Sequence, residues 1–77
     1  MKTTFSTHSN VIASVGYDEN TKTLFAKFVK SGMYAYLNVP EHFFVGFRKA
    51  GSKGKYLRYF KTFNFPCVKV EDFINTL

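Results

Sequence analysis

The chain has 77 residues, of which 45% are hydrophobic and 21% are charged, and its formal net charge is +6. This length supports one small domain over residues 1–77 and leaves little room for both a core and a deep substrate cleft. The single cysteine excludes an internal disulfide framework, and no run of about 18 apolar residues exists that could span a membrane. The first residues also lack the apolar stretch of a signal peptide, so we expect a reduced, cytoplasmic protein.

Three strands are predicted in the first half of the chain. Each is a short run rich in β-branched, aromatic and other apolar residues, and polar or glycine-containing segments separate the runs. The strands are expected at 11–17, 23–30 and 33–39. A polar cluster at 18–22 makes the first turn, in which Asp18 and Glu19 are read as turn residues.

The dipeptide Ser31-Gly32 predicts a tight two-residue hairpin turn, because glycine takes positive φ without steric cost. Pairing outward from this turn gives one wholly apolar face, which we expect to meet the core. Its cross-strand pairs are Phe28–Ala35, Ala26–Leu37 and Leu24–Val39. The opposite face, expected to meet solvent, has the pairs Val29–Tyr34, Lys27–Tyr36 and Phe25–Asn38.

After Pro40 the hydrophobic period changes from two residues to that of a helix. Apolar residues at i, i+4 and i+7, beginning at Phe43, predict a helix over 41–50 whose phenylalanine stripe packs on the sheet, with Phe47 in its centre. Gly51 is expected to end this helix as its C-cap.

Ser52 is a suitable N-cap for a second helix. Tyr56, Phe60 and Phe63 repeat at helical spacing in this segment, and the lysines and arginines between them fall mainly on the outer faces. Pro66 breaks the helical pattern.

The sequence therefore predicts an α+β fold. It consists of a three-stranded antiparallel meander followed by two helices packed on one face, with a short fourth strand over 67–70 near the C-terminus. A terminal turn of helix is expected over 71–77.

Six of the eleven lysine and arginine residues lie between Arg48 and Lys61, and no acidic residue interrupts them. Three aromatic residues are interleaved with these cations. Cations alternating with rings favour an anionic polymer with stackable bases as the partner. An acidic protein surface is the alternative partner, and a third reading is that the charge serves only solubility.

Two constellations refine the nucleic-acid hypothesis. Tyr34 and Tyr36, with Lys27 on the neighbouring strand, resemble a base-stacking platform, unless both rings pack under the N-terminus or the C-terminal tail. The segment 52–55 could hold a phosphate at a helix start, unless it is an ordinary corner between helices. The candidate nucleic-acid-binding residues are Lys27, Tyr34, Tyr36, Arg48, Lys49, Ser52, Lys53, Lys55, Tyr56, Arg58 and Lys61.

No catalytic or metal-binding pattern is visible. His8, His42 and Cys67 are too scattered to match a zinc motif, so no metal or other cofactor is expected. Adjacent carboxylates in an exposed turn lack the two distinct environments that acid–base catalysis needs. An enzyme is therefore the least favoured class.

A series of short elements also runs through the chain in a fixed order: YD, YxY, VP and SxGxY. The residues concerned are Ser9, Ile12, Val15, Gly16, Tyr17, Asp18, Leu24, Phe28, Gly32, Tyr34, Ala35, Tyr36, Val39, Pro40, Ala50, Ser52, Gly54 and Tyr56. Their order and approximate spacing resemble the KTSC domain, a family named after the C-terminal extension of some lysyl-tRNA synthetases. The resemblance covers about residues 7–60 and leaves 62–77 as an added tail.

The resemblance implies a short stand-alone bacterial or phage protein and, through the synthetase context, a role in binding RNA. Together with the basic segment, it favours a non-catalytic binding module for RNA or another nucleic acid. The alternative is a small protein-binding adaptor, or a phage-encoded modulator, that binds an acidic surface of a host protein. No membrane partner is expected.

Overall fold

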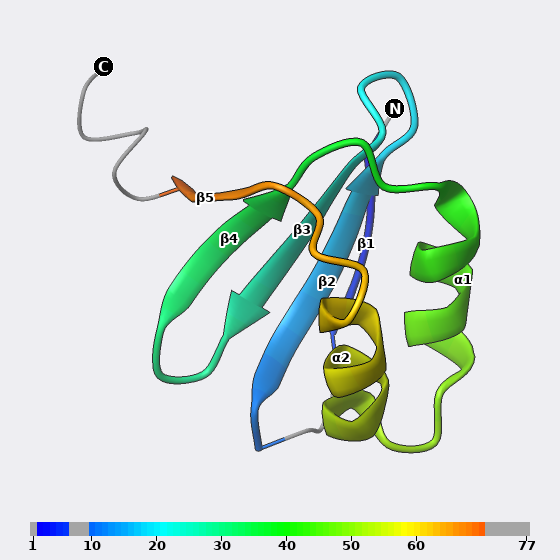
Figure 1. The fold of residues 1–77 in the computed structure, drawn as a ribbon. Helices are drawn as coiled ribbons and strands as arrows, with labels where there is room; N and C mark the ends of the chain where they lie inside the picture. Colours follow the sequence, from blue (N-terminus) through cyan, green and yellow to red (C-terminus); the bar gives the residue numbers. More distant parts are fainter. Residues whose placement is uncertain (1, 7–9, 71–77) are drawn as a thin grey trace.

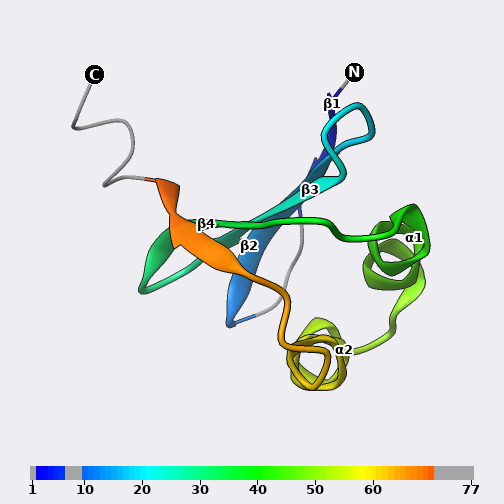
Figure 2. The same ribbon diagram turned by 45° about the horizontal axis from the view of Figure 1, so that its top comes forward.

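The computed structural model describes residues 2–6 and 10–70, which form one antiparallel sheet and two helices (Figure 1). The sheet has five strands in the spatial order β1-β2-β3-β4-β5 within these residues. The strands are β1 (Lys2–Ser6), β2 (Ile12–Asp18), β3 (Thr23–Phe28), β4 (Gly32–Tyr36) and β5 (Cys67–Lys69). The helices, α1 (Glu41–Lys49) and α2 (Lys53–Lys61), lie between β4 and β5 in the chain and on the same face of the sheet (Figure 2).

The α+β class and its element order are confirmed, including the meander β2-β3-β4, the two helices on one face and the short strand near the C-terminus. Strand β1 was not predicted, because Phe5 is the only large apolar residue in it and no alternating pattern results. Phe5 pairs with Val15 across the strands, and its ring lies 5.5 Å from that of Phe44. The terminal helical turn expected at 71–77 lies outside the described residues.

The predicted register between the second and third strands of the meander is wrong. Phe28 pairs with Gly32, Ala26 with Tyr34 and Leu24 with Tyr36, a shift of three residues from the expected pairing. A shift by an odd number exchanges the two faces of β4, because side chains alternate along a strand. Tyr34 and Tyr36 are consequently on the core face, together with their partners on β3, Ala26 and Leu24.

The turn explains this error. Residues 29–31 form a three-residue connection, and Gly32, with φ of 84°, is the first paired residue of β4 rather than part of a two-residue turn. A left-handed residue after a three-residue loop is a common hairpin closure. The positive φ of this glycine was thus correctly expected, but its place in the hairpin was not. Ala35 is buried but lies opposite Phe25 on the face of the sheet that neither helix covers, which we call the uncovered face, and Leu37 is 36% exposed. Neither residue therefore belongs to the predicted contact with the helices.

The core lies between the sheet and the two helices. Phe43, Phe44 and Phe47 are buried, as the helical stripe predicted, and Phe60 and Leu57 of α2 are buried beside them. The sheet contributes the buried residues Ile12, Val15, Tyr17, Leu24, Ala26 and Tyr36. A register irregularity between Ile12 and Ser14 brings both Ile12 and Val15 into this core.

Edge-to-face ring contacts connect the helices to each other. The Phe60 ring lies 5.4 Å from the rings of both Phe43 and Phe47, at interplanar angles of 70° and 65°. Tyr36 brings the sheet into this network, with its ring 5.0 Å from that of Phe60. Phe63 departs from expectation: α2 ends at Lys61, and the Phe63 side chain is 46% exposed.

Tyr56 of α2 lies directly against Gly46 of α1. A Cβ atom at position 46 would stand only 2.0 Å from the Tyr56 hydroxyl oxygen and 2.4 Å from the ring carbon that carries it, so no side chain fits there without movement of the ring. The corner itself needs no glycine. Ala50 is the C-cap of α1, in extended conformation, and Gly51 does not take the positive φ expected of it.

Truncation of Phe47 tests the core assignment. Phe47 has no exposed surface, and Phe47→Ala should lower the free energy of unfolding by about 3–5 kcal/mol, because it removes the ring and leaves a cavity. Val45→Ala is the matched control in the same helix: Val45 is 39% exposed, and its change should stay within about 0.5 kcal/mol. Equal denaturation midpoints for the two variants would show that the helix face is wrongly assigned.

A second pair of variants tests the contact between the helices. Gly46→Ala should lower the free energy of unfolding by about 1–3 kcal/mol, because the new methyl group displaces the Tyr56 ring. Gly54→Ala in α2 meets no atom within 4 Å and should raise it by about 0.5–1 kcal/mol through helix propensity. Urea denaturation of both variants measures the difference, and stabilisation by both would contradict the close approach.

Candidate nucleic-acid interface

The basic segment runs from the last turn of α1, through the connection between the helices, to the end of α2. Five of its six cations are exposed to solvent: Arg48, Lys49, Lys55, Arg58 and Lys61. Because the segment contains no carboxylate, its positive field is not neutralised by its own side chains.

Lys53 is the exception. Its Nζ donates hydrogen bonds to the main-chain oxygens of Ala50, at 2.5 Å, and Arg48, at 3.3 Å, and lies 5.9 Å from the centre of the Phe5 ring. A lysine at this place satisfies the free carbonyl groups at the end of α1 and matches the negative end of its dipole. The Lys53 ammonium group is therefore already engaged in hydrogen bonds within the fold.

A side chain of the protein itself caps the start of α2. Ser52 is the N-cap of α2, as predicted, and its hydroxyl oxygen accepts a hydrogen bond from the main-chain N–H of Lys55 at 3.3 Å. This bond uses one of the N–H groups that a bound phosphate would need. The structure thus gives segment 52–55 the features of a helix–helix corner.

One side of α2 combines exposed cations with an exposed ring. Lys55, Arg58, Tyr59 and Thr62 follow one another at helical spacing (i, i+3, i+4, i+7) and are all exposed, opposite the buried Leu57 and Phe60. We call these four residues, with Phe63 directly after them, the outer face of α2. Tyr59 is 53% exposed, and its ring lies 5.3 Å from that of Phe63 at an angle of 82°.

Tyr59 and Phe63 were missed as candidate binding residues by sequence reasoning. The spacing of Tyr59 from Lys55 and Arg58 is visible in the sequence, whereas Phe63 continues the helical repeat of Tyr56 and Phe60, which is typical of an apolar stripe. Both rings rest on Phe43, at 6.5 Å and 4.9 Å between ring centres. One side of each ring is thereby held by the core while the remainder meets solvent.

Tyr56, a candidate from the sequence, lies between the helices rather than on the outer face. Its ring is half-buried and lies 4.7 Å from that of Phe47. Burial, and secondarily the neighbouring Tyr59, raises the pKa of the Tyr56 hydroxyl above its usual value. Its position fits a role in joining the helices.

The stacking platform predicted on the sheet is not formed. Tyr36 is only 7% exposed and packs against Phe60, and Tyr34 shares that core face. Lys27 is exposed on the opposite, uncovered face, where it pairs with Met33. The correction follows from the shifted register, which separates Lys27 from the two tyrosines.

Asp18 supports the local structure of the first turn. The Asp18 carboxylate accepts a hydrogen bond from the main-chain N–H of Asn20 at 3.0 Å, as expected of a turn residue. Within the described residues, no group of three or more histidine, cysteine or acidic side chains is placed to hold a metal ion. His8, one of the scattered candidates, lies outside those residues. None of the helices described is long and apolar enough to cross a membrane.

Comparison with known proteins places the chain in a family. The family model of the KTSC domain matches residues 8–62, which include all the candidate binding residues named from the sequence. The crystal structure of a KTSC domain protein from Yersinia pestis has a TM-score of 0.83 and 33% sequence identity, with 90% of this chain and 97% of that chain covered. No curated protein matches the chain. Strand β5 lies beyond the residues that the family model matches. Both the family match and the shared fold confirm the resemblance seen in the sequence, and the chain belongs to the KTSC domain family.

Proposed function

We propose that this protein is a non-catalytic module that binds single-stranded RNA through the outer face of α2. The observation that carries the proposal is the exposed pair of rings, Tyr59 and Phe63, set beside the exposed Lys55 and Arg58 on one side of one helix. Exposed rings stack on unpaired bases, while neighbouring cations meet the phosphates.

The distribution of charge supports an anionic partner. No acidic residue occurs between Glu41 and Glu71, whereas seven of the eleven lysine and arginine residues lie in that interval. Arg48 and Lys49 at the end of α1 extend the positive surface beyond α2. Such a surface attracts a polyanion over a distance of about one Debye length and gains affinity through counterion release.

The rings favour RNA over the second candidate, an acidic protein surface of a host protein. Cations alone would serve either partner, but two adjacent half-exposed rings beside them are the arrangement used for unpaired bases. The synthetase context of the family agrees with RNA. A cytoplasmic location is part of the same proposal.

The salt dependence of binding tests the contribution of the cations. With three phosphate contacts on α2, from Lys55, Arg58 and Lys61, the slope of log affinity against log salt should be about −2, at about −0.7 for each contact. Replacing Lys55 and Arg58 with glutamine should flatten this slope by about 1.4. Fluorescence anisotropy with a labelled 10-nucleotide RNA, a length within the range of about 4–16 nucleotides that a single OB-fold covers, measures it.

The matched control for that variant is Lys22→Gln with Lys27→Gln, which removes the same charge from exposed positions away from α2. An equal loss of slope in the control would mean that net charge alone drives binding. An acidic polypeptide of equal charge provides the second comparison. Binding to it as tight as to RNA would favour the protein partner.

Truncation of the exposed ring tests stacking separately from charge. Tyr59→Ala should weaken RNA binding by about 1–3 kcal/mol, because one base loses its stacking partner, and should leave the salt slope unchanged. Val68→Ala, which truncates a side chain exposed to a similar extent (49%) on β5, is the control. Anisotropy titrations at two salt concentrations provide both quantities, and unaltered RNA affinity in Tyr59→Ala would remove the stacking role.

A further inference from the structure

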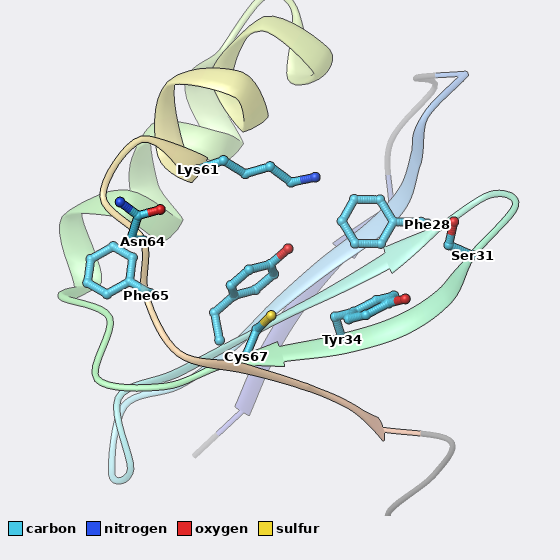
Figure 3. Close-up of a pocket in the computed structure, with 8 residues that line it drawn as sticks. Phe28, Ser31, Tyr34, Lys61, Asn64, Phe65 and Cys67 are labelled. Atoms are coloured by element: carbon cyan, nitrogen blue, oxygen red, sulfur yellow. The ribbon is translucent and has the colours of Figure 1, made fainter.

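A pocket of about 480 Å³ opens on the core face of the sheet, beyond the end of α2 (Figure 3). Its volume is in the range of small-ligand sites. The residues that line it come from β3, the β3–β4 turn, β4, the end of α2, the following connection and β5; they are Phe28, Ser31, Tyr34, Tyr36, Lys61, Asn64, Phe65 and Cys67.

The walls of the pocket are fixed by the fold. Asn64, with φ of 56°, turns the chain away from α2, and the main-chain oxygen of Pro66 then accepts a hydrogen bond from the N–H of Leu37 at 2.8 Å. Phe65 stacks on Phe60, with 5.3 Å between the rings and an angle of 25°. The connection is thus attached to the core on one side and to β4 on the other, which leaves the pocket open between them.

Rings and hydroxyl groups dominate the surface of the pocket. Phe28 and Tyr34 meet edge to face at 5.6 Å, and both are only half-buried, so that their remaining surface is accessible from the pocket. Within the described residues, no hydrogen bond joins the hydroxyl groups of Tyr34 and Tyr36 to another group. Burial, followed by the effects of Cys67 and Tyr34, raises the pKa of the Tyr36 hydroxyl, which therefore remains a hydrogen-bond donor at neutral pH.

Lys61 is the one charged residue among the described residues that line the pocket. Its side chain extends from the end of α2 toward Phe28 in Figure 3, and its Nζ lies 5.7 Å from the centre of the Phe28 ring. Among the described residues that line the pocket, none is a carboxylate that would neutralise this ammonium group. The pocket therefore combines flat apolar walls, the hydroxyl groups of Ser31, Tyr34 and Tyr36, and one cation at its edge.

We propose that this pocket binds one nucleotide, with the base between the aromatic walls and the phosphate at Lys61. A purely apolar ligand would leave the hydroxyl groups unpaired, and a small anion such as inorganic phosphate would leave the rings uncovered. A nucleotide satisfies both sets of groups. The proposal rests on the proposed function in one respect: we take the nucleotide to be part of an RNA strand bound on the outer face of α2. Lys61, the last residue of α2, lies beside the pocket.

A free mononucleotide has the same chemistry as a nucleotide in a strand, and the test must separate the two sources. Cys67 makes this test direct, because it is the only cysteine of the chain, is exposed, and lines the pocket. Iodoacetamide alkylates it without carrying a charge that Lys61 would attract. The rate of alkylation therefore reports whether the pocket is occupied.

At about ten times its Kd, single-stranded RNA should slow Cys67 alkylation about tenfold, because the reagent reaches only the unoccupied pocket. Uridine and adenosine monophosphates should protect at higher concentration, and inorganic phosphate should not protect. Lys61→Met should weaken protection by the mononucleotides about tenfold, the usual effect of losing one charge-assisted hydrogen bond. Lys27→Met, on the opposite face of β3, should leave protection unchanged.

The outcomes distinguish this proposal from the previous one. RNA that binds by anisotropy but leaves the alkylation rate unchanged overturns the pocket proposal and leaves the outer face of α2 as the RNA site. Protection by mononucleotides without RNA binding supports the pocket as a site for free nucleotides and overturns the strand function. Protection by phosphate equal to that by mononucleotides, or an equal effect of Lys27→Met, overturns the nucleotide assignment.

Discussion

The ring packing that holds two short helices on one face of the sheet determines the other features of this protein. Phe60 stands at the centre of that packing, in contact with Phe43 and Phe47 on the helix side and with Tyr36 on the sheet side. Each helix has only nine residues, too few to be stable alone in water, so its helicity depends on burying this apolar face. Once α2 is fixed by Phe60, the direction of its opposite face is fixed as well.

The two proposed binding features follow from the same placement of α2. Its cations and Tyr59 face solvent because Leu57 and Phe60 face the core. The pocket exists because α2 ends at Lys61, and the chain then returns to pair β5 with β4, which places Cys67 opposite Tyr36. Lys61 is exposed at the boundary between the outer face of α2 and the pocket. An RNA strand on the helix could therefore deliver one nucleotide to the pocket without leaving the basic surface.

Features that depend on local sequence were predictable. The phenylalanine spacing in α1 and the cap at Ser52 each specify a helix through neighbouring residues, and both predictions are confirmed. The register of β4 was not predictable in the same way, because Ser31-Gly32 suits both a two-residue turn and a three-residue loop closed by glycine. The choice between them depends on packing: the observed register buries Tyr36 against Phe60, a contact between distant parts of the chain.

The candidate site was predictable in charge but not in geometry. The cluster of cations was visible in the sequence, yet the fold assigns Lys53 to the end of α1 and Lys27 to the opposite face of the sheet. The pocket had no sequence signal, because residues from six different segments of the chain line it. Tyr34, Lys61 and Cys67 come together only through strand pairing and the path of the chain after α2.

Chemical-shift titration of the isotope-labelled protein with a short single-stranded RNA, at low and moderate salt, tests the proposed interface most directly. Binding through α2 predicts shifts for the amides of Lys55, Arg58 and Tyr59, which diminish as salt rises, while Lys27 and Met33 on the uncovered face of the sheet remain unchanged. Shifts centred on that uncovered face, or no shifts at low salt, would contradict the proposal that α2 carries the RNA-binding surface.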